Sequence, residues 1–161
     1  METLGKIKQT LEKMLVIHKR LLDLEKEKQM VLVNGDAKLL QNVINQESTL
    51  VEQIGKLEGE RQQQVKQFAS EKKLPSQIST VNDLIRCLDN QEEKSSLIQS
   101  AQQLTVLVEE IQQLVKSNQE LIKLSLSYVQ YSMGILIQRE PAIGYGPRSS
   151  KGHVNFLDAK A

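Results

Sequence analysis

Apolar residues recur at heptad spacing in the stretch from about Asn90 to Gln138. The members of this ladder, separated alternately by four and three residues, are Leu97, Ala101, Leu104, Val108, Ile111, Val115, Asn118, Ile122, Ser125, Val129, Ser132 and Leu136. Such spacing places all of them on one stripe of an α-helix and is typical of the seam of a helical bundle. The pattern therefore predicts one long helix over this stretch.

The last third of this helix has a different surface. Ser125 and Ser132 make the ladder polar there, while apolar residues appear off it: Leu124, Leu126, Tyr128, Tyr131, Met133, Ile135 and Ile137. No residue from Leu124 to Gln138 is charged. A helix that is apolar nearly all round must be covered by something, and the rest of the chain is too short to do so. We expect a partner to cover it, and weak self-association is one form of this. Core beneath the tail is the alternative, but Tyr and Met with few charges are typical of interfaces.

Two further helices precede this one, over about Thr3–Val33 and Ala37–Ser70. The inner face of the first carries Leu4, Ile7, Leu11, Met14, His18 and Leu21. The inner face of the second carries Leu40, Val43, Ile44, Glu47, Leu50, Val51, Ile54, Leu57, Arg61, Val65 and Phe68. Between them, Gly35 supplies the left-handed residue that ends one helix and Asp36 can cap the next. So short a turn makes the two helices antiparallel neighbours.

The remaining boundaries come from proline and from capping residues. Pro75 ends the second helix, Ser79 or Thr80 can cap a short helix, and Pro141 ends the long one. We therefore expect an all-α fold, an antiparallel bundle of three long helices plus a short connecting helix over residues 1–140. The tail, 141–161, has the Gly, Pro and Ser content of a flexible segment. At about 1.5 Å per residue, the third long helix spans roughly 70 Å against roughly 45 to 50 Å for the others, so its C-terminal end should overhang the bundle.

Composition and charge exclude several function classes. The net charge of +1 gives no reason to expect nucleic acid or an anionic membrane as a partner, and the uncharged stretch is too polar and short for stable membrane insertion. Because Cys87 stands alone and the N-terminus is polar, we expect a cytoplasmic protein. His18, His153 and Cys87 offer no metal spacing, and no pattern predicts a cofactor or catalysis.

Several single residues have two interpretations. His18 is best explained as a structural residue at the edge of the seam, and Cys87 as a small buried hydrophobe of the short helix. Asn118 is either a functional polar site or, as we favour, a polar core group that fixes the register. Glu47 and Arg61 either pair with other helices or lie at a seam edge.

A family resemblance covers essentially the whole chain. Gly35-Asp36 opens a helix with Leu40, Ile44, Glu47, Leu50, Ile54, Leu57-Glu58 and Arg61, and the long C-terminal helix leads to a tail with Tyr145-Gly146 and a terminal Phe156-Leu157-Asp158-Ala159-Lys160-Ala161. With the N-terminal helix, this arrangement resembles the FlgN family, cytoplasmic chaperones of the flagellar type III export apparatus.

The resemblance implies a function that composition could not show. Members of this family bind the C-terminal segments of the hook-filament junction proteins FlgK and FlgL, prevent their premature assembly and pass them to the export gate. By position, the substrate-binding region falls on the C-terminal half of the long helix and on the tail. The residues that we expect to contact the partner are Leu121, Leu124, Tyr128, Tyr131, Ile135, Phe156 and Leu157. The alternative is a structural coiled-coil protein that self-assembles through the same seam.

Overall fold

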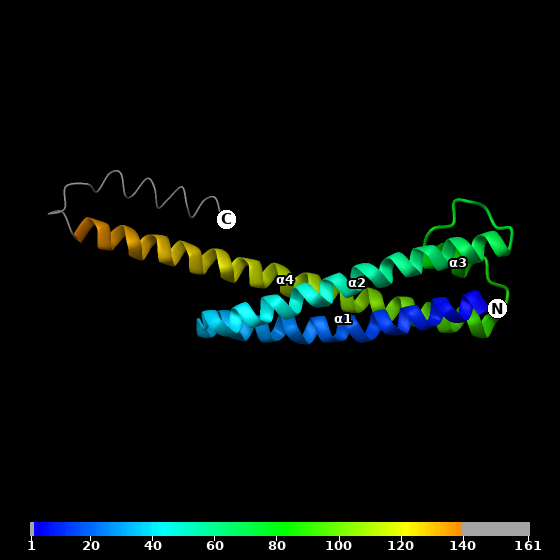
Figure 1. Cartoon of the computed structure of the whole chain (residues 1–161), viewed down its shortest axis with the longest axis horizontal. Coiled ribbons are helices and arrows are strands. Elements are labelled where there is room, and N and C mark those ends of the chain that lie inside the picture. Colours follow the sequence, from blue (N-terminus) through cyan, green and yellow to red (C-terminus); the bar gives the residue numbers. More distant parts are fainter. Residues whose placement is uncertain (1, 140–161) are drawn as a thin grey trace. The chain divides into compact units, whose positions relative to one another are not determined.

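The described part of the chain forms four helices and no strand. The computed structural model describes the backbone of residues 2–139 and the side chains of 2–137. The helices are α1 (Glu2–Asn34), α2 (Ala37–Glu71), α3 (Val81–Arg86) and α4 (Gln91–Arg139) (Figure 1). This confirms the all-α prediction of three long helices and a short connecting one, with helix ends within one or two residues of those expected.

The chain divides into two compact units, Met1–Asn118 and Gln119–Ala161. The first contains α1, α2, α3 and the N-terminal part of α4, and the second begins within α4. The overhang and the tail expected from the sequence both concern the second unit, and they stay predictions. The same holds for the division between residues 140 and 141.

The turn between α1 and α2 has the predicted chemistry. Gly35 adopts a φ of +72° and its N–H donates to the Val31 carbonyl at 3.0 Å. The Asp36 carboxylate accepts from the N–H groups of Lys38 and Leu39 at 3.1 and 3.0 Å, so it caps α2. These contacts satisfy backbone groups that a helix end leaves free. The two helices then run antiparallel and side by side in the first unit (Figure 1).

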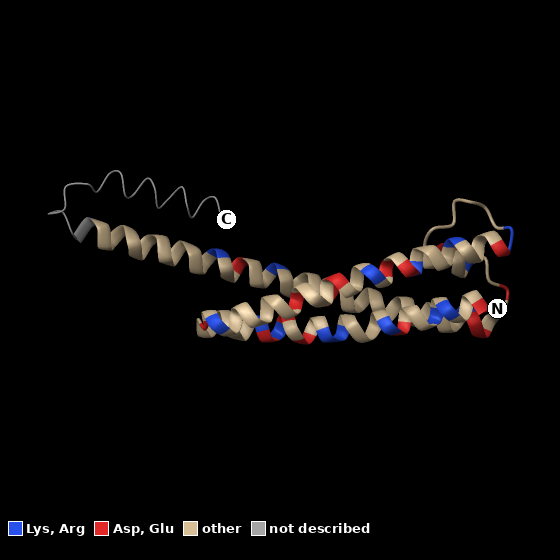
Figure 2. Cartoon of the chain, in the orientation of Figure 1, with Lys and Arg blue, Asp and Glu red and all other residues tan. Residues whose placement is uncertain are grey.

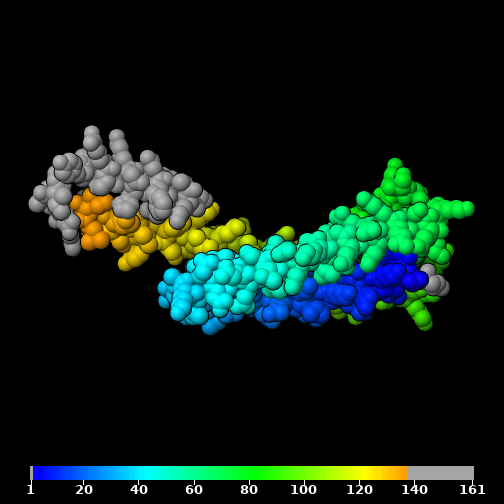
Figure 3. Space-filling view, viewed as in Figure 1, coloured from blue at the N-terminus to red at the C-terminus, as the bar shows by residue number. Residues whose placement is uncertain are grey.

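The connection from α2 to α4 is closed by two more caps. Thr80 and Asp83 form a capping box at the start of α3, and the Asn90 side chain accepts from the N–H groups of Glu92 and Glu93 at the start of α4. In α3, Leu84 is fully buried, and Val81 and Ile85 are buried with it. Figure 3 shows the surface of the connection between α2 and α4, in green, next to the N-terminal end of α1, in dark blue.

Two hydrophobic clusters hold the first unit together. One lies where α3 and the N-terminal ends of α1 and α4 meet the end of α2, and its buried members include Ile7, Leu11, Val65, Leu84 and Leu97. The other lies nearer the α1–α2 turn, with buried members Leu21, Leu22, Leu24, Val31, Val43, Leu50 and Ile111. Because α1, α2 and α4 contribute to both clusters, they form the three long helices of the predicted bundle up to Asn118.

Three residues lie differently from the sequence-based expectation. Ile44 and Val51 were placed on the inner face of α2, but both are exposed, because the buried stripe follows Val43, Leu50 and Leu57. Cys87 was expected to be a buried hydrophobe, and it is exposed. The reason is that α3 ends at Arg86, so Cys87 is its C-cap, and Leu88 packs against the core in its place.

Candidate partner-binding surface

The predicted seam of α4 is real as far as Asn118. Leu97 has no exposed surface, Ile111 and Asn118 are buried, and Ala101, Leu104 and Val115 are half-buried against the two clusters. After Asn118 the same ladder is less covered: Ile122 and Ser132 are half-buried, and Ser125, Val129 and Leu136 are exposed. The change coincides with the boundary between the two units.

A second apolar stripe starts where the first one fails. Leu121, Leu124, Tyr128, Tyr131 and Ile135 are separated alternately by three and four residues, so they share one face of α4. Each stands one position before a member of the first ladder, which corresponds to a rotation of about 100° around the helix axis. The second stripe is therefore a different face of the helix from the first seam. We call these five residues the second stripe.

Most of the second stripe is open to solvent. The side chains of Leu124, Tyr128 and Tyr131 are 68%, 73% and 69% exposed, and Leu121 and Ile135 are half-buried. Figure 2 shows a stretch without blue or red along the C-terminal part of α4, and the sequence has no charged residue from Leu124 to Gln138. An exposed stripe of this kind offers apolar area and two tyrosine hydroxyls but no ionisable catalytic group at neutral pH.

The geometry of the second stripe suits one kind of ligand. From Leu121 to Ile135 it extends roughly 21 Å, about four helical turns. Apolar anchors at i, i+3, i+7 and i+10 are what a second amphipathic helix needs in order to pack along it. The remaining two residues predicted to contact the partner, Phe156 and Leu157, lie outside the described residues.

Three other residues singled out in the sequence have structural explanations. The His18 ring is buried and its Nδ1 lies 2.6 Å from the Met14 carbonyl oxygen. Arg61 pairs with Glu58 on its own helix, and Glu47 pairs across helices with Lys28 at 2.8 Å. Among the described residues, no group of three His, Cys, Asp or Glu side chains is placed to hold a metal ion. None of the described helices has the length and hydropathy to cross a bilayer.

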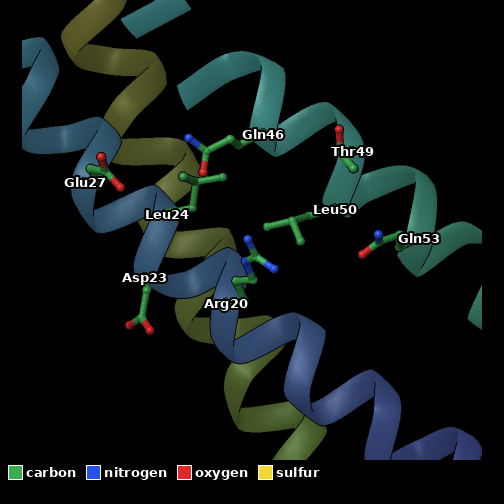
Figure 4. A pocket seen from close by; sticks show the side chains of 8 residues that line it. All are labelled: Arg20, Asp23, Leu24, Glu27, Gln46, Thr49, Leu50 and Gln53. Carbon is green, nitrogen blue, oxygen red and sulfur yellow. The ribbon is translucent and has the colours of Figure 1, made fainter. Parts of the chain in front are cut away.

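Two open grooves run along the α1–α2 surface. One, of 280 Å³, is lined by Arg20, Asp23, Leu24, Glu27, Gln46, Thr49, Leu50 and Gln53. Figure 4 shows Leu24 and Leu50 pointing between the helices, whereas Asp23 points away from the gap. The other, of 580 Å³, lies beside it and is lined by Gln9, Glu12, Lys13, Val16, Ile17, Gln53, Lys56, Leu57 and Glu60. Both have rims of mixed charge and amides, which is typical of the solvated face of a helical hairpin.

A buried polar cluster connects three helices in the first unit. Glu25 of α1 and Asn118 of α4 are each 1% exposed, and Asn118 Nδ2 donates to Glu25 Oε2 at 2.8 Å. Burial, together with a hydrogen bond to Glu47, raises the pKa of Glu25. For Glu47, burial acts against ionisation, but the hydrogen bonds with Glu25 and Lys28 prevail and lower its pKa. Asn118 is thus a polar core group, as we favoured.

The sequence-based predictions do not include Glu25, although its position in the heptad pattern is visible. It continues the heptad ladder of α1 after His18 and Leu21. A charged residue at such a position is a candidate for burial with a partner. The pattern alone does not distinguish Glu25 from Arg61, however. Arg61 also occupies a heptad position, in α2, and it pairs with Glu58 of the same helix.

Comparison with known proteins identifies the family of this chain. The FlgN protein family matches residues 1–152, a range that includes the whole second stripe and ends before Phe156. The chain is also 25% identical over 160 residues to the uncharacterized protein YvyG of Bacillus subtilis (strain 168), and the match covers 94% of each chain. No solved structure matches this chain. With a family match over nearly its full length and an all-helical fold, the chain belongs to the FlgN family of flagellar export chaperones.

Proposed function

We propose that this protein is a cytoplasmic export chaperone for the hook-filament junction proteins FlgK and FlgL. It holds their C-terminal segments, prevents premature assembly and delivers them to the export gate. The task requires no catalysis and no cofactor. It requires a surface that recognises an apolar segment reversibly and leaves it unmodified.

The observation that carries the proposal is the exposed second stripe of α4. Leu124, Tyr128 and Tyr131 present apolar area within a segment, Leu124 to Gln138, that contains no charged residue. Such area is costly to leave in water and is found where proteins meet partners. An amphipathic helix from the cargo can cover it by packing along the stripe.

The direct test is calorimetry of the full chain with the isolated C-terminal segments of FlgK and FlgL, each titrated separately. We expect saturable binding with one segment per chaperone, and a negative heat-capacity change because apolar surface is buried. A scrambled segment of the same composition serves as the control. If neither segment bound, the proposed cargo would be wrong. If only one segment bound, the cargo would be limited to that protein.

Self-association through the second stripe is the competing use of the same surface. A chaperone that keeps its stripe for cargo should sediment as a monomer or a weak dimer whose apparent mass rises only at high concentration. A structural coiled-coil protein should instead form a stable oligomer at all concentrations. Analytical ultracentrifugation over a hundredfold range of concentration separates the two, and a stable oligomer that resists dilution would favour the structural alternative.

The C-terminal tail has its own proposed role in cargo binding. We propose that Phe156 and Leu157 contact the bound cargo and act as a clamp. Deleting residues 142–161 should then lower the affinity for the cargo segment and leave the self-association of the free chaperone unchanged. Exchanging Phe156 and Leu157 for serine in the full chain should reproduce most of the loss, since apolar contact is the proposed cause.

A rise in cargo affinity after this deletion would indicate a different role for the tail. If the tail covers the second stripe until cargo arrives, the deletion should raise affinity and increase binding of a hydrophobic dye by the free protein. Calorimetry gives the dissociation constant of the cargo segment for the truncated chain and for the intact chain, and the direction of the difference distinguishes a clamp from a cover. Equal affinity with and without the tail would exclude both roles.

A further inference from the structure

Three helices of the first unit meet at one buried carboxyl group, that of Glu25. From α4, Asn118 Nδ2 donates to Glu25 Oε2 at 2.8 Å and to the Glu25 backbone carbonyl at 3.0 Å. From α2, the Glu47 carboxyl faces that of Glu25, and each of the two groups shifts the pKa of the other. Lys28, on α1, donates to Glu47 Oε2 at 2.8 Å. The charged groups that face Glu25 are therefore Lys28 and Glu47, while α4 contributes a neutral amide.

Two carboxyl groups that face each other can share a hydrogen bond only if one of them carries a proton, because ionised carboxylates can only accept. Lys28 stabilises the charge on Glu47, so the proton belongs on Glu25. Burial has the same effect, since Glu25 is almost inaccessible and a second negative charge beside Glu47 would lack a second cation. The raised pKa of Glu25 and the lowered pKa of Glu47 agree with this assignment.

Asn118 ties this carboxyl pair to α4. Its Nδ2 group makes both of its hydrogen bonds with Glu25, whereas its Oδ1 atom is buried without a partner among the described residues. The side-chain hydrogen bonds of Asn118 therefore depend on Glu25 alone, while the neighbouring Ser117 accepts a longer one from Gln29 of α1 at 3.4 Å. Asn118 is also the last residue of the first unit, three residues before the second stripe begins at Leu121.

We propose that Glu25 and Glu47 form a proton-binding site that anchors α4 to the α1–α2 hairpin at Asn118. With the proton bound, Glu25 donates to Glu47 and accepts from Asn118, so one side chain links α1, α2 and α4. When the proton is lost, two carboxylates share a buried position with a single lysine. The contact between the three helices then weakens, and the free energy of unfolding falls.

The direction of the pH dependence follows from the two pKa shifts. For Glu25, whose folded pKa is raised, stabilisation is complete below the unfolded value of about 4.5 and is lost as the pH rises through the folded pKa. For Glu47, whose folded pKa is lowered, stabilisation is present above about 4.5 and is lost as the pH falls through the folded pKa. The site is therefore most favourable near pH 4.5 and becomes less so toward neutral and alkaline pH.

The test compares Glu25→Gln with the intact chain by urea and thermal unfolding between pH 4.5 and 8. Glutamine imitates the protonated side chain, because its amide can donate to Glu47 and accept from Asn118. We expect the variant to match the intact chain near pH 4.5 and to melt roughly 2 to 4 °C higher at pH 8. Glu27→Gln, which removes an exposed carboxylate two residues away, is the matched control and should show no such trend. A Glu25→Gln difference that is constant across the pH range, or a variant less stable at pH 8, would overturn the proposal.

A second measurement uses the intact chain and so does not depend on the variant folding. Carbon NMR of labelled glutamate side chains should show Glu25 titrating above the ordinary range for glutamate, and Glu47→Gln should move that titration to lower pH. The side-chain amide of Asn118 should shift with the same midpoint as Glu25. An ordinary midpoint for Glu25 would refute the proton site, and an Asn118 amide that ignores the titration would refute the link to α4.

Discussion

Replacing Tyr131 with aspartate should raise the dissociation constant for the cargo segment at least about 30-fold, a loss of about 2 kcal/mol, without changing the helical content of the chaperone. Tyr131 is exposed in the middle of the second stripe, so its exchange removes no intramolecular packing of the described residues. In the complex, the same position would bury a carboxylate against an apolar partner, which is costly when no cation is near. Calorimetry of cargo binding, with circular dichroism of the free chain, measures both quantities.

The matched control for this variant is Gln130→Asp. It adds the same charge to the same turn of α4, but Gln130 is not a member of the second stripe. We expect binding to change only slightly, because the charge remains in water. Equal losses for the two variants would indicate a general electrostatic effect in place of a contact along the stripe. If Tyr131→Asp unfolds the chain, the segment is part of a core and the binding surface lies elsewhere.

Truncation of Leu97 to alanine should lower the free energy of unfolding by about 2 to 5 kcal/mol. Leu97 has no exposed surface and packs in the cluster that joins α3 to α1, α2 and α4. Its loss removes buried apolar area and leaves a cavity that the surrounding helices can fill only in part. Urea unfolding followed by circular dichroism gives the free energy directly.

Leu124→Ala is the control for this prediction, because it makes the same chemical change in the same helix. Leu124 is mostly exposed, so the free energy of unfolding should change by no more than about 0.5 kcal/mol. The affinity for the cargo segment should respond in the opposite way. Leu124→Ala should lower this affinity, and Leu97→Ala should leave it unchanged as long as the chain is folded. If Leu97→Ala were no more destabilised than Leu124→Ala, the assignment of core and surface along α4 would be wrong.

Helix positions and ends could be predicted from the sequence because they depend on local chemistry. A left-handed glycine followed by Asp36, a cap at Ser79 or Thr80 and a proline after α2 act within a few residues, and the structure confirms the turn and places the cap at Thr80. Heptad spacing likewise identified the seam of α4 as far as Asn118. The uncharged segment after Leu124 was also visible, and its contact with cargo remains a prediction.

Burial of polar residues could not be predicted in the same way. Glu25, Glu47 and Arg61 all occupy heptad positions, yet Glu25 is buried among three helices, Glu47 pairs with Lys28 and Arg61 pairs with Glu58 on its own helix. Their environments depend on which residues of the other helices lie opposite them. One-dimensional periodicity does not contain this information, because it describes each helix without its neighbours.

The sequence by itself determined four helices, the antiparallel turn at Gly35 and a long C-terminal helix with an uncharged end. Only the tertiary structure decided that Cys87 and Val51 face solvent, and that Leu124, Tyr128 and Tyr131 of the second stripe are exposed. It also decided that Glu25 meets Glu47 and Asn118, which are remote from it in the chain. The physical reason is that helix formation follows from local hydrogen bonds and spacing, whereas burial and pKa depend on side chains that folding brings together from distant parts of the chain.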